Sequence, residues 1–448
     1  MPEYAPTGLN PAALAFILAM GFLLMVLPRR LAVLPLFAAA CYMTMGQVVN
    51  VAGLNFSIIR ILVLVGWVRL LIRGEFRSIR LNPIDVAMLW WTAASVTIYT
   101  LLWRSGGAFI YKCGQAYDAI GLYILFRALV RDVDDIVRIF RMLAVLIAPL
   151  AALMMLEKTT GRNLFAIFGG VPAFTIVRDG VLRCQGPFPH SILAGTFAAA
   201  LVPFFLALWS QRRGRLLALA GLFSSTVITL TSGSSGPFLT YGCGVLGFLF
   251  WHFRFQMQMV RRALVLGLFC LQLVMDAPFW FVIAHMGLFS GSTAYYRAFL
   301  IDQTIRHFSE WWLIGTKYEV VWAPLLYDIT NMYVRVAFDG GLLSLVLFFL
   351  ILKRCYGGVG RAIRKEVHGS FAIQRCIWAL GAALFAHTMT FLAVWYWDQN
   401  IVNWYVLLAM IAAVAAPVYA ARKKTEHGIE SLTETTSKPE PAWSLMAS

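Results

Sequence analysis

Residues His285 to Asn331 read HMGLFSGSTAYYRAFLIDQTIRHFSEWWLIGTKYEVVWAPLLYDITN, and they form the longest stretch of mixed polarity between the apolar runs of this chain. The stretch combines charged side chains with tyrosines and tryptophans. The apolar runs on either side of it recur along the whole chain. A helix needs roughly 20 such residues to cross the ~30 Å hydrocarbon core of a bilayer. The sequence therefore predicts a membrane bundle that holds this segment at one surface.

Composition places the chain among integral membrane proteins. Of its 448 residues, 60% are hydrophobic and 13% are charged, a balance that soluble domains of this size do not have. The net charge of +16 does not indicate a nucleic-acid partner, because lysine and arginine occur in short clusters between apolar runs. The seven cysteines are scattered without a CxxC pair, so we predict no metal site.

The apolar runs predict an all-α polytopic membrane protein with about 12–13 transmembrane helices. Three of the runs are short, the second, eighth and ninth, so that one can be re-entrant or two can tilt around a cavity. Thirteen spans would place the N-terminus outside, and twelve would place it inside. The runs lie near 11–27, 31–48, 56–72, 84–103, 111–130, 136–156, 190–209, 216–232, 237–251, 263–284, 332–352, 373–394 and 403–421.

Basic clusters predict the orientation of the chain. They fall on alternate connections, which assigns that side to the cytoplasm. The opposite connections include two large ones, which are then extracytoplasmic. The predicted division is N-terminal helices (1–156), a first periplasmic loop (157–189), central helices (190–284), a large periplasmic loop (285–331), C-terminal helices (332–421) and a disordered cytoplasmic tail (422–448).

Three charged residues lie inside otherwise apolar runs: Arg60, Lys112 and Asp118. Lys112 and Asp118 are six residues apart, so they do not share a helical face. Arg60 can pair with Asp118 across two helices, or either residue can line a polar cavity. Charged residues at membrane depth are functional candidates, and a structural or interfacial ion pair is the alternative.

A first motif precedes the seventh apolar run, where the chain reads VRDGVLRCQGPFPHSILAGTFAAALVP from Val177 to Pro203. Arg183 precedes an irregular turn and His190 opens the predicted helix. A helix N-terminus favours anions, and a planar guanidinium beside it suits a phosphate. The alternative is an ordinary entry into a helix with a surface arginine.

Two further segments have both structural and functional interpretations. The turn TLTSGSSGPF, Thr229 to Phe238, offers hydroxyls that can satisfy backbone groups or contact a ligand. Asp328 and Asn331 bracket the start of the eleventh predicted span, where either side chain can cap the helix. Gly340 and Gly341 within that span can allow close helix packing.

Three blocks together resemble the O-antigen ligase and O-antigen polymerase family of bacterial membrane glycosyltransferases. They are RCQGPFPHSILAGTF (183–197), TSGSSGP (231–237), and the large loop with YYRAFLIDQTIRHFSEWWLIGTKYE followed by DITNMYVRVAFDGGLL. The resemblance covers roughly residues 140 to 420. The long loop near the C-terminal end, followed by about three apolar runs, matches the layout of that family.

The resemblance implies a GT-C-like fold and a periplasmic active site in the bacterial inner membrane. The donor would be a glycan on undecaprenyl diphosphate, and the acceptor a sugar hydroxyl, with no metal, nucleotide or other cofactor. By position, Arg183 and Arg297 would hold the diphosphate, whose charge increases as it leaves. Polysaccharide export or flippase machinery would be a further partner.

One departure from the family concerns the catalytic base. Ligases commonly carry a His-Asn pair where this chain has Thr330-Asn331, so the resemblance implies a catalytic role for Asn331. Asp328 can take the role of the missing histidine, with His307 and His190 as substitutes. Arg306 and Tyr296 in the large loop are further site candidates. The departure favours a polymerase over a lipid A-core ligase. A polytopic transporter or flippase and a non-catalytic assembly subunit are the alternatives.

Overall fold

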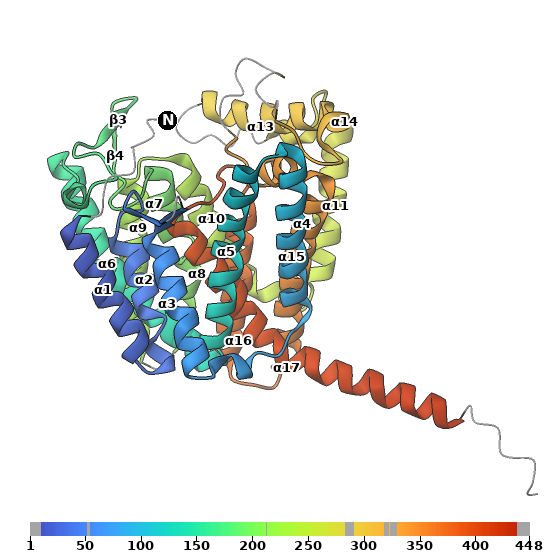
Figure 1. Cartoon of the computed structure of the whole chain (residues 1–448). Coiled ribbons are helices and arrows are strands. Elements are labelled where there is room, and N and C mark those ends of the chain that lie inside the picture. The colour runs from blue at the N-terminus through green and yellow to red at the C-terminus, as the bar shows by residue number, and fades with distance from the viewer. Residues whose placement is uncertain are drawn as a thin grey trace, which may run out of the picture.

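Helices make up most of the structure and run side by side between two ends of a bundle (Figure 1). The computed structural model describes residues 10–51, 54–211, 213–282, 291–317, 322 and 329–436. The N-terminal half contains α1 (Pro11–Val26), α2 (Leu34–Tyr42), α3 (Ile58–Ile72), α4 (Pro83–Trp103), α5 (Gly106–Leu129) and α6 (Val133–Thr160). It is followed by α7 (Ser191–Ala199), α8 (Val202–Leu208), α9 (Arg215–Thr231), α10 (Ser235–Leu249) and α11 (Met257–Val274). The C-terminal part contains α13 (Gly291–Arg306), α14 (Phe308–Trp311), α15 (Met332–Lys365), α16 (Phe371–Thr390) and α17 (Gln399–Thr436).

The helices identify a multi-pass membrane protein. Among the described residues, six helical segments are long and apolar enough to cross a bilayer: α4, α6, α7 with α8, α11, α15 and the Gln399–Pro417 part of α17. A helix lies at each of the thirteen predicted positions. The number of helices that cross the membrane, and the side that each connection occupies, stay predictions.

Two predicted spans end well before their predicted C-terminal bounds in the structure. In place of 31–48 there is the nine-residue α2, followed by a hairpin of β1 (Val48–Val51) and β2 (Leu54–Ser57), in which Val48 pairs with Ser57. The β-branched residues of the segment favour the extended chain. In place of 263–284, α11 ends at Val274, because Pro278 and the restricted residue before it cannot continue the helix.

In the first part of the tail 422–448, for which the sequence predicts disorder, the structure has a helix. Helix α17 continues to Thr436, and this end projects away from the bundle (Figure 1). Alanine, arginine, lysine and glutamate dominate residues 419–430 and favour a helix by their intrinsic propensity. Residues 437–448 lie outside the described part of the chain.

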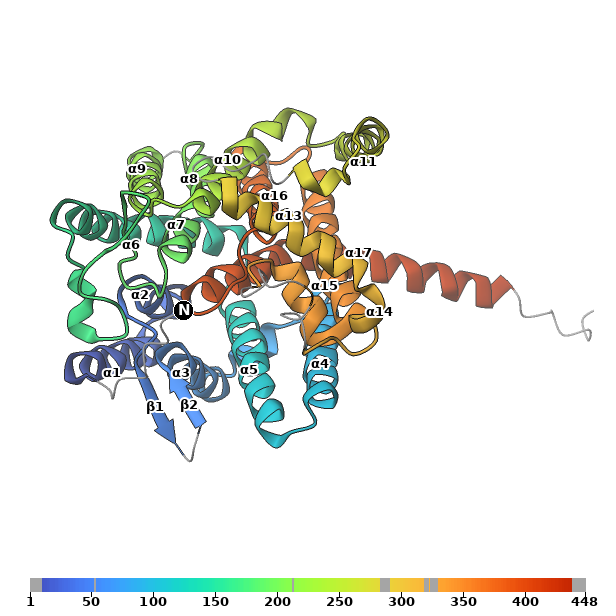
Figure 2. The same ribbon diagram turned by 90° about the horizontal axis from the view of Figure 1, so that it is seen from above.

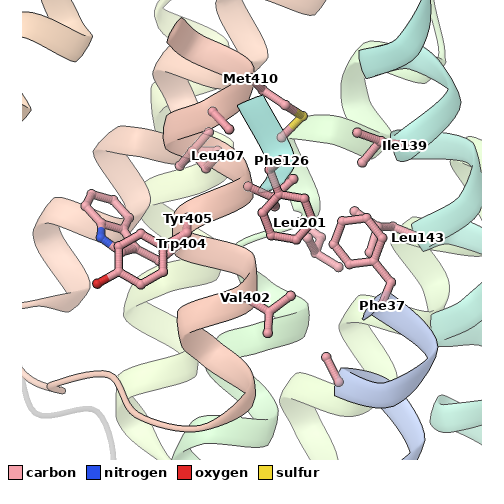
Figure 3. Close-up of a cluster of buried hydrophobic side chains, with 14 of the residues drawn as sticks. Phe37, Phe126, Ile139, Leu143, Leu201, Val402, Trp404, Tyr405, Leu407 and Met410 are labelled. Carbon is pink, nitrogen blue, oxygen red and sulfur yellow. The ribbon is translucent and has the colours of Figure 1, made fainter. Parts of the chain in front are cut away.

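The inner part of α17 lies at the centre of the bundle and contacts α2, α5, α7, α15 and α16 (Figure 2). Figure 3 shows apolar side chains from α2, α5, α6 and α17 gathered in this core, including Phe37, Phe126, Leu143 and Leu407, all of them fully buried. Small residues bring the neighbouring helices close. A Cβ atom on Gly66 of α3 would lie 2.5 Å from a methyl group of Leu125 on α5.

A network of buried polar groups joins α4 to α5 at the end of the bundle opposite the α4–α5 turn. Asp85 accepts hydrogen bonds from the Tyr123 hydroxyl at 2.5 Å and from Nε of Arg127 at 3.0 Å. Its second carboxylate oxygen accepts the backbone N–H of Asn82 at 2.7 Å, which closes a capping box at the start of α4. Both ion-pair partners are almost fully buried.

The glycines of α15 hold the large loop in place. Gly341 has φ +63°, and a Cβ there would lie 2.6 Å from the Leu313 carbonyl oxygen. The N–H of Leu342 donates to the Trp312 carbonyl at 2.7 Å, and that of Thr316 donates to the Phe338 carbonyl at 3.0 Å. The predicted role in helix packing is therefore corrected for Gly341, which admits the loop backbone into a break in α15, whereas a Cβ on Gly340 would meet Ser344 of α15 itself.

Candidate functional site

The first two sequence blocks, separated by about forty residues, are in contact. The short hairpin of β3 (Ile176–Arg178) and β4 (Val181–Arg183) leads into Cys184, whose N–H donates to the Thr231 carbonyl at 3.1 Å. Ser191 and Ser234 have hydroxyl oxygens 3.3 Å apart. Gly233 has φ +58°, and a Cβ there would lie 3.4 Å from Cγ of Arg183. The serine-rich turn therefore forms one wall beside Arg183.

Arg183 is a half-buried cation with no acidic hydrogen-bond partner among the described residues. Its Nε is buried and makes no hydrogen bond there. Burial lowers the pKa of Arg183, and Arg178 lowers it further, against the opposing effect of Asp179. A guanidinium nevertheless stays charged. A desolvated cation without a fixed counter-charge is suited to an anionic ligand.

His190 caps the helix that begins beside Arg183. Its Nδ1 accepts the N–H of Ile192 at 3.1 Å, at the start of α7. Burial lowers the pKa of His190 to about 4, and Arg183 and Arg178 contribute to the shift. The ring is therefore neutral at pH 7 and serves as a hydrogen-bond acceptor. Arg183 lies beside Gly233, and the next residue, Ser234, contacts Ser191 in the first turn of α7, so the arginine lies near the N-terminus of this helix.

We expect His190→Asn to keep both the stability and the activity of the protein, because the shorter amide can also cap a helix. His190→Ala should lose about 1 kcal/mol of stability with the cap. Thermal unfolding of the purified variants measures this difference.

Since the pKa of His190 lies below its unfolded value of 6.5, its contribution to stability falls as the pH drops from about 6.5 to about 4. The wild type should lose more stability over that range than His190→Asn. An Asn variant that is stable but inactive would instead assign chemistry to the ring.

Arg297 lies on α13, which passes across the ends of α10, α16 and α15 (Figure 2). The arginine is half-buried, and this burial lowers its pKa. No ion pair of Arg297 occurs among the described residues. Its neighbour Tyr296 packs against an apolar cluster that includes Leu300 and Phe338, which seats α13 on α15. The described residues give no direct contact between Arg183 and Arg297, so their joint action on one diphosphate stays a prediction.

Arg306 and His307 organise the large loop itself. Arg306 pairs with Asp302 at 2.6 Å, one helical turn away on α13. The His307 ring stacks on Trp322 with centroids 4.7 Å apart, and its Nδ1 lies 2.7 Å from Glu310. Trp322 donates to the same carboxylate at 2.6 Å. Both hydrogen bonds lower the pKa of Glu310, and the one from His307 has the larger effect. Neither Arg306 nor His307 has a described contact with Arg183.

Asn331 is the N-cap of α15, which confirms the structural interpretation of this residue. Its Oδ1 accepts the N–H groups of Tyr333 and Val334, at 2.9 and 3.2 Å. Its Nδ2 donates to the Leu392 carbonyl at 3.2 Å, so the side chain ties α15 to segment 391–398. Asp328, the predicted base, lies outside the described residues.

A cavity of about 550 Å³ lies between the β1–β2 hairpin, α3, α4, α5, α15 and segment 391–398. Arg60 binds Asp118 through two hydrogen bonds of 2.8 and 2.6 Å, which confirms the predicted pair across two helices. Lys112 lies 2.8 Å from Asp339, which also forms an ion pair with Arg335, with Nε and Oδ1 3.2 Å apart. The charges that lie inside apolar runs of the sequence therefore both pair and line a cavity.

Asp398 is a candidate that the sequence reasoning missed. It follows Trp395-Tyr396-Trp397 just before α17, has φ +51°, and lines the same cavity. Burial raises its pKa to about 7, nearby Asp118 raises it further, and Arg60 opposes the shift. A carboxyl group that titrates near neutral pH is suited to proton transfer. In the sequence, this candidate is marked by its position directly after three aromatic residues, on a short connection between two apolar runs.

No protein-family model matches this chain, and no curated protein matches it. The resemblance drawn from the three sequence blocks therefore stays an expectation.

Proposed function

We propose that this protein is an inner-membrane glycosyltransferase. It would transfer an oligosaccharide from undecaprenyl diphosphate to a sugar hydroxyl at the periplasmic face, and would polymerise the repeat of an exopolysaccharide or O-antigen. The observation that carries the proposal is Arg183, a half-buried guanidinium whose Nε has no described partner, set beside a serine-rich turn and the start of α7. Such a site is suited to a phosphate.

The sidedness of the site supports a periplasmic reaction. The β3–β4 hairpin and α13 lie at the same end of the bundle (Figure 1). Helix α6 runs from the basic segment around Arg131 to the connection that contains this hairpin, and α15 runs from the large loop to the basic segment around Arg361. Basic connections favour the cytoplasmic side, so the end that carries Arg183 and α13 would face the periplasm.

In the proposed reaction, the two arginines act on the leaving group. The acceptor hydroxyl oxygen forms a bond to the anomeric carbon of the donor. The bond from that carbon to the phosphate oxygen breaks, and undecaprenyl diphosphate leaves with the electron pair. Arg183 and Arg297 would stabilise the negative charge that grows on it. The hydroxyl proton passes to a carboxylate, for which Asp328 is the candidate from the sequence and Asp398 the candidate from the cavity.

A transporter is the second candidate function, and the cavity favours it specifically. Polar cavities with ion pairs between helices are characteristic of membrane carriers. A carrier for a lipid-linked glycan or a small solute would need the cavity to open alternately to both sides. It would not need an unpaired arginine beside a helix N-terminus at one end.

Sizing of the lipid-linked glycans in a deletion strain tests these functions. A polymerase predicts single repeat units on undecaprenyl diphosphate at the periplasmic face and no polymer. A ligase predicts full-length polymer retained on the lipid carrier. A flippase predicts single units that accumulate on the cytoplasmic side, where an impermeant oxidant added to whole cells does not reach them. An unchanged lipid-linked pool and unchanged surface polymer, in a strain without a second copy of the gene, would contradict the proposal.

A further inference from the structure

The cavity between α3, α4, α5 and α15 differs in charge from the surroundings of Arg183. Its lining contains three cations and three carboxylates: Arg60, Lys112 and Arg335 against Asp118, Asp339 and Asp398. The formal charge of the lining is therefore zero when Asp398 is ionised. Pairs such as Arg60–Asp118 and Lys112–Asp339 are already formed within the protein. A diphosphate gains little from such a balanced lining, whereas a neutral ligand with many hydroxyl groups can bond to cations and carboxylates alike.

Aromatic side chains supply the second property of the cavity. Trp395 and Trp397 lie together, with ring centroids 4.8 Å apart, and Arg335 lies over the Trp395 ring at 5.3 Å. Trp91 also lines the cavity, and its buried indole N–H has no partner among the described residues. The faces of aromatic rings carry partial negative charge, which attracts the C–H groups on the face of a sugar ring. The indole N–H can donate to a sugar hydroxyl.

We propose that this cavity binds the acceptor saccharide, as a neutral glycan that rests on Trp395 and Trp397 and bonds through its hydroxyls to the paired charges around it. The inference rests on the proposed function, because that function makes a glycan the second substrate. It adds a separation of the two substrates: the anionic donor at Arg183, and the neutral acceptor between α4, α5 and α15. A volume of about 550 Å³ lies within the range of small-ligand sites and accommodates a few sugar residues.

The position of the cavity agrees with such an acceptor site. Segment 391–398 lines it, and Asn331 ties this segment to the start of α15, where the large loop ends. Lys317 is the last residue of the described stretch 291–317 of that loop. Its ammonium group lies over the ring of Trp103, the last residue of α4, at 5.1 Å. The large loop is therefore anchored on two of the helices that line the cavity, so a saccharide could reach the cavity from the end that carries the loop.

Calorimetric titration of the purified full-length protein tests this inference without turnover. The probe is the repeat-unit oligosaccharide, released from the cellular lipid-linked pool by mild acid and treated with phosphatase. The detergent must carry no sugar headgroup. We expect saturable binding to the wild type that weakens at least tenfold in Trp397→Ala and in Gln115→Leu. Gln115 also lines the cavity, and its replacement is the milder change, since within the described part of the chain its amide donates one hydrogen bond, to the nearby Tyr111 hydroxyl.

Trp90→Ala is the matched control, because Trp90 is next to Trp91 on α4 but is 65% exposed. It should bind the saccharide as the wild type does. Inorganic pyrophosphate is the second probe, and its binding should depend on Arg183 and not on Trp397. Absence of saccharide binding, or equal binding in the Trp397, Gln115 and Trp90 variants, would overturn the inference. If the saccharide binds as expected while deletion leaves the lipid-linked pool unchanged, the acceptor role fails with the proposed function and the cavity remains a saccharide site.

Discussion

Replacement of Arg183 by alanine should lower polymer output by about a hundredfold or more while the protein still inserts in the membrane. The half-buried guanidinium has no described acidic partner to leave behind, so its loss should remove binding to the donor and not destabilise the fold. Two charge-assisted hydrogen bonds to a phosphate are worth about 1.5–3 kcal/mol each, which corresponds to at least a hundredfold in rate. Glycan sizing in a complemented deletion strain, with membrane protein levels measured by immunoblot, gives the result.

Two further variants make the Arg183 experiment specific. Arg183→Lys keeps the charge but loses the planar fork, so it should retain only part of the output. Arg178→Ala removes an arginine from the same hairpin that is 49% exposed and lies 3.7 Å from Asp179. This control should remain close to the wild type. Normal polymer from a stably inserted Arg183→Ala variant would show that the arginine does not bind the donor.

Asp85→Ala should be the most destabilising of the substitutions considered, with an expected loss of about 3–5 kcal/mol. It would leave the buried Arg127 without its counter-charge and Tyr123 without its acceptor, and it would remove one half of the capping box at Asn82. Thermal unfolding in detergent, followed by size-exclusion fluorescence, measures the loss.

Asp134→Ala is the control for this prediction, because Asp134 is an exposed carboxylate in the first turn of α6. Its removal should cost about 0.3–1 kcal/mol through the helix dipole. Similar melting temperatures for the two alanine variants would mean that the Asp85 network does not hold α4 and α5 together.

Much of the fold follows from local sequence properties. A helix occurs at each of the thirteen apolar runs, because helix length and apolarity are properties of a continuous stretch, whereas α13 and α14 lie in the large loop and were not predicted. The pairing of Arg60 with Asp118 was among the predictions, since few partners satisfy a charge inside an apolar run. The second run was expected to be short, but the β1–β2 hairpin that follows α2 was not predicted, because an apolar run that contains several β-branched residues fits a helix or a strand.

The arrangement of the site depends on contacts that local patterns do not encode. Lys112 and Asp339 are 227 residues apart, and the packing of α4 against both α5 and α15 brings them together. The hydrogen bond from Cys184 to Thr231 that sets the serine-rich turn beside Arg183 is likewise long-range. For this reason the sequence identified the chemical character of single residues, such as Arg183, but not the cavity that contains Asp398.

A reconstituted reaction tests the central claim most directly. The purified protein would be placed in liposomes with the extracted undecaprenyl-diphosphate-linked repeat unit, in the presence of a chelator and without nucleotide. Mass analysis of the lipid extract would then follow both products. The proposed function predicts glycans of two or more repeats on the lipid and one released undecaprenyl diphosphate for each glycosidic bond formed, both lost in Arg183→Ala. Redistribution of unchanged lipid-linked units between the two leaflets, with no new glycosidic bond, would contradict the glycosyltransferase and identify a transporter.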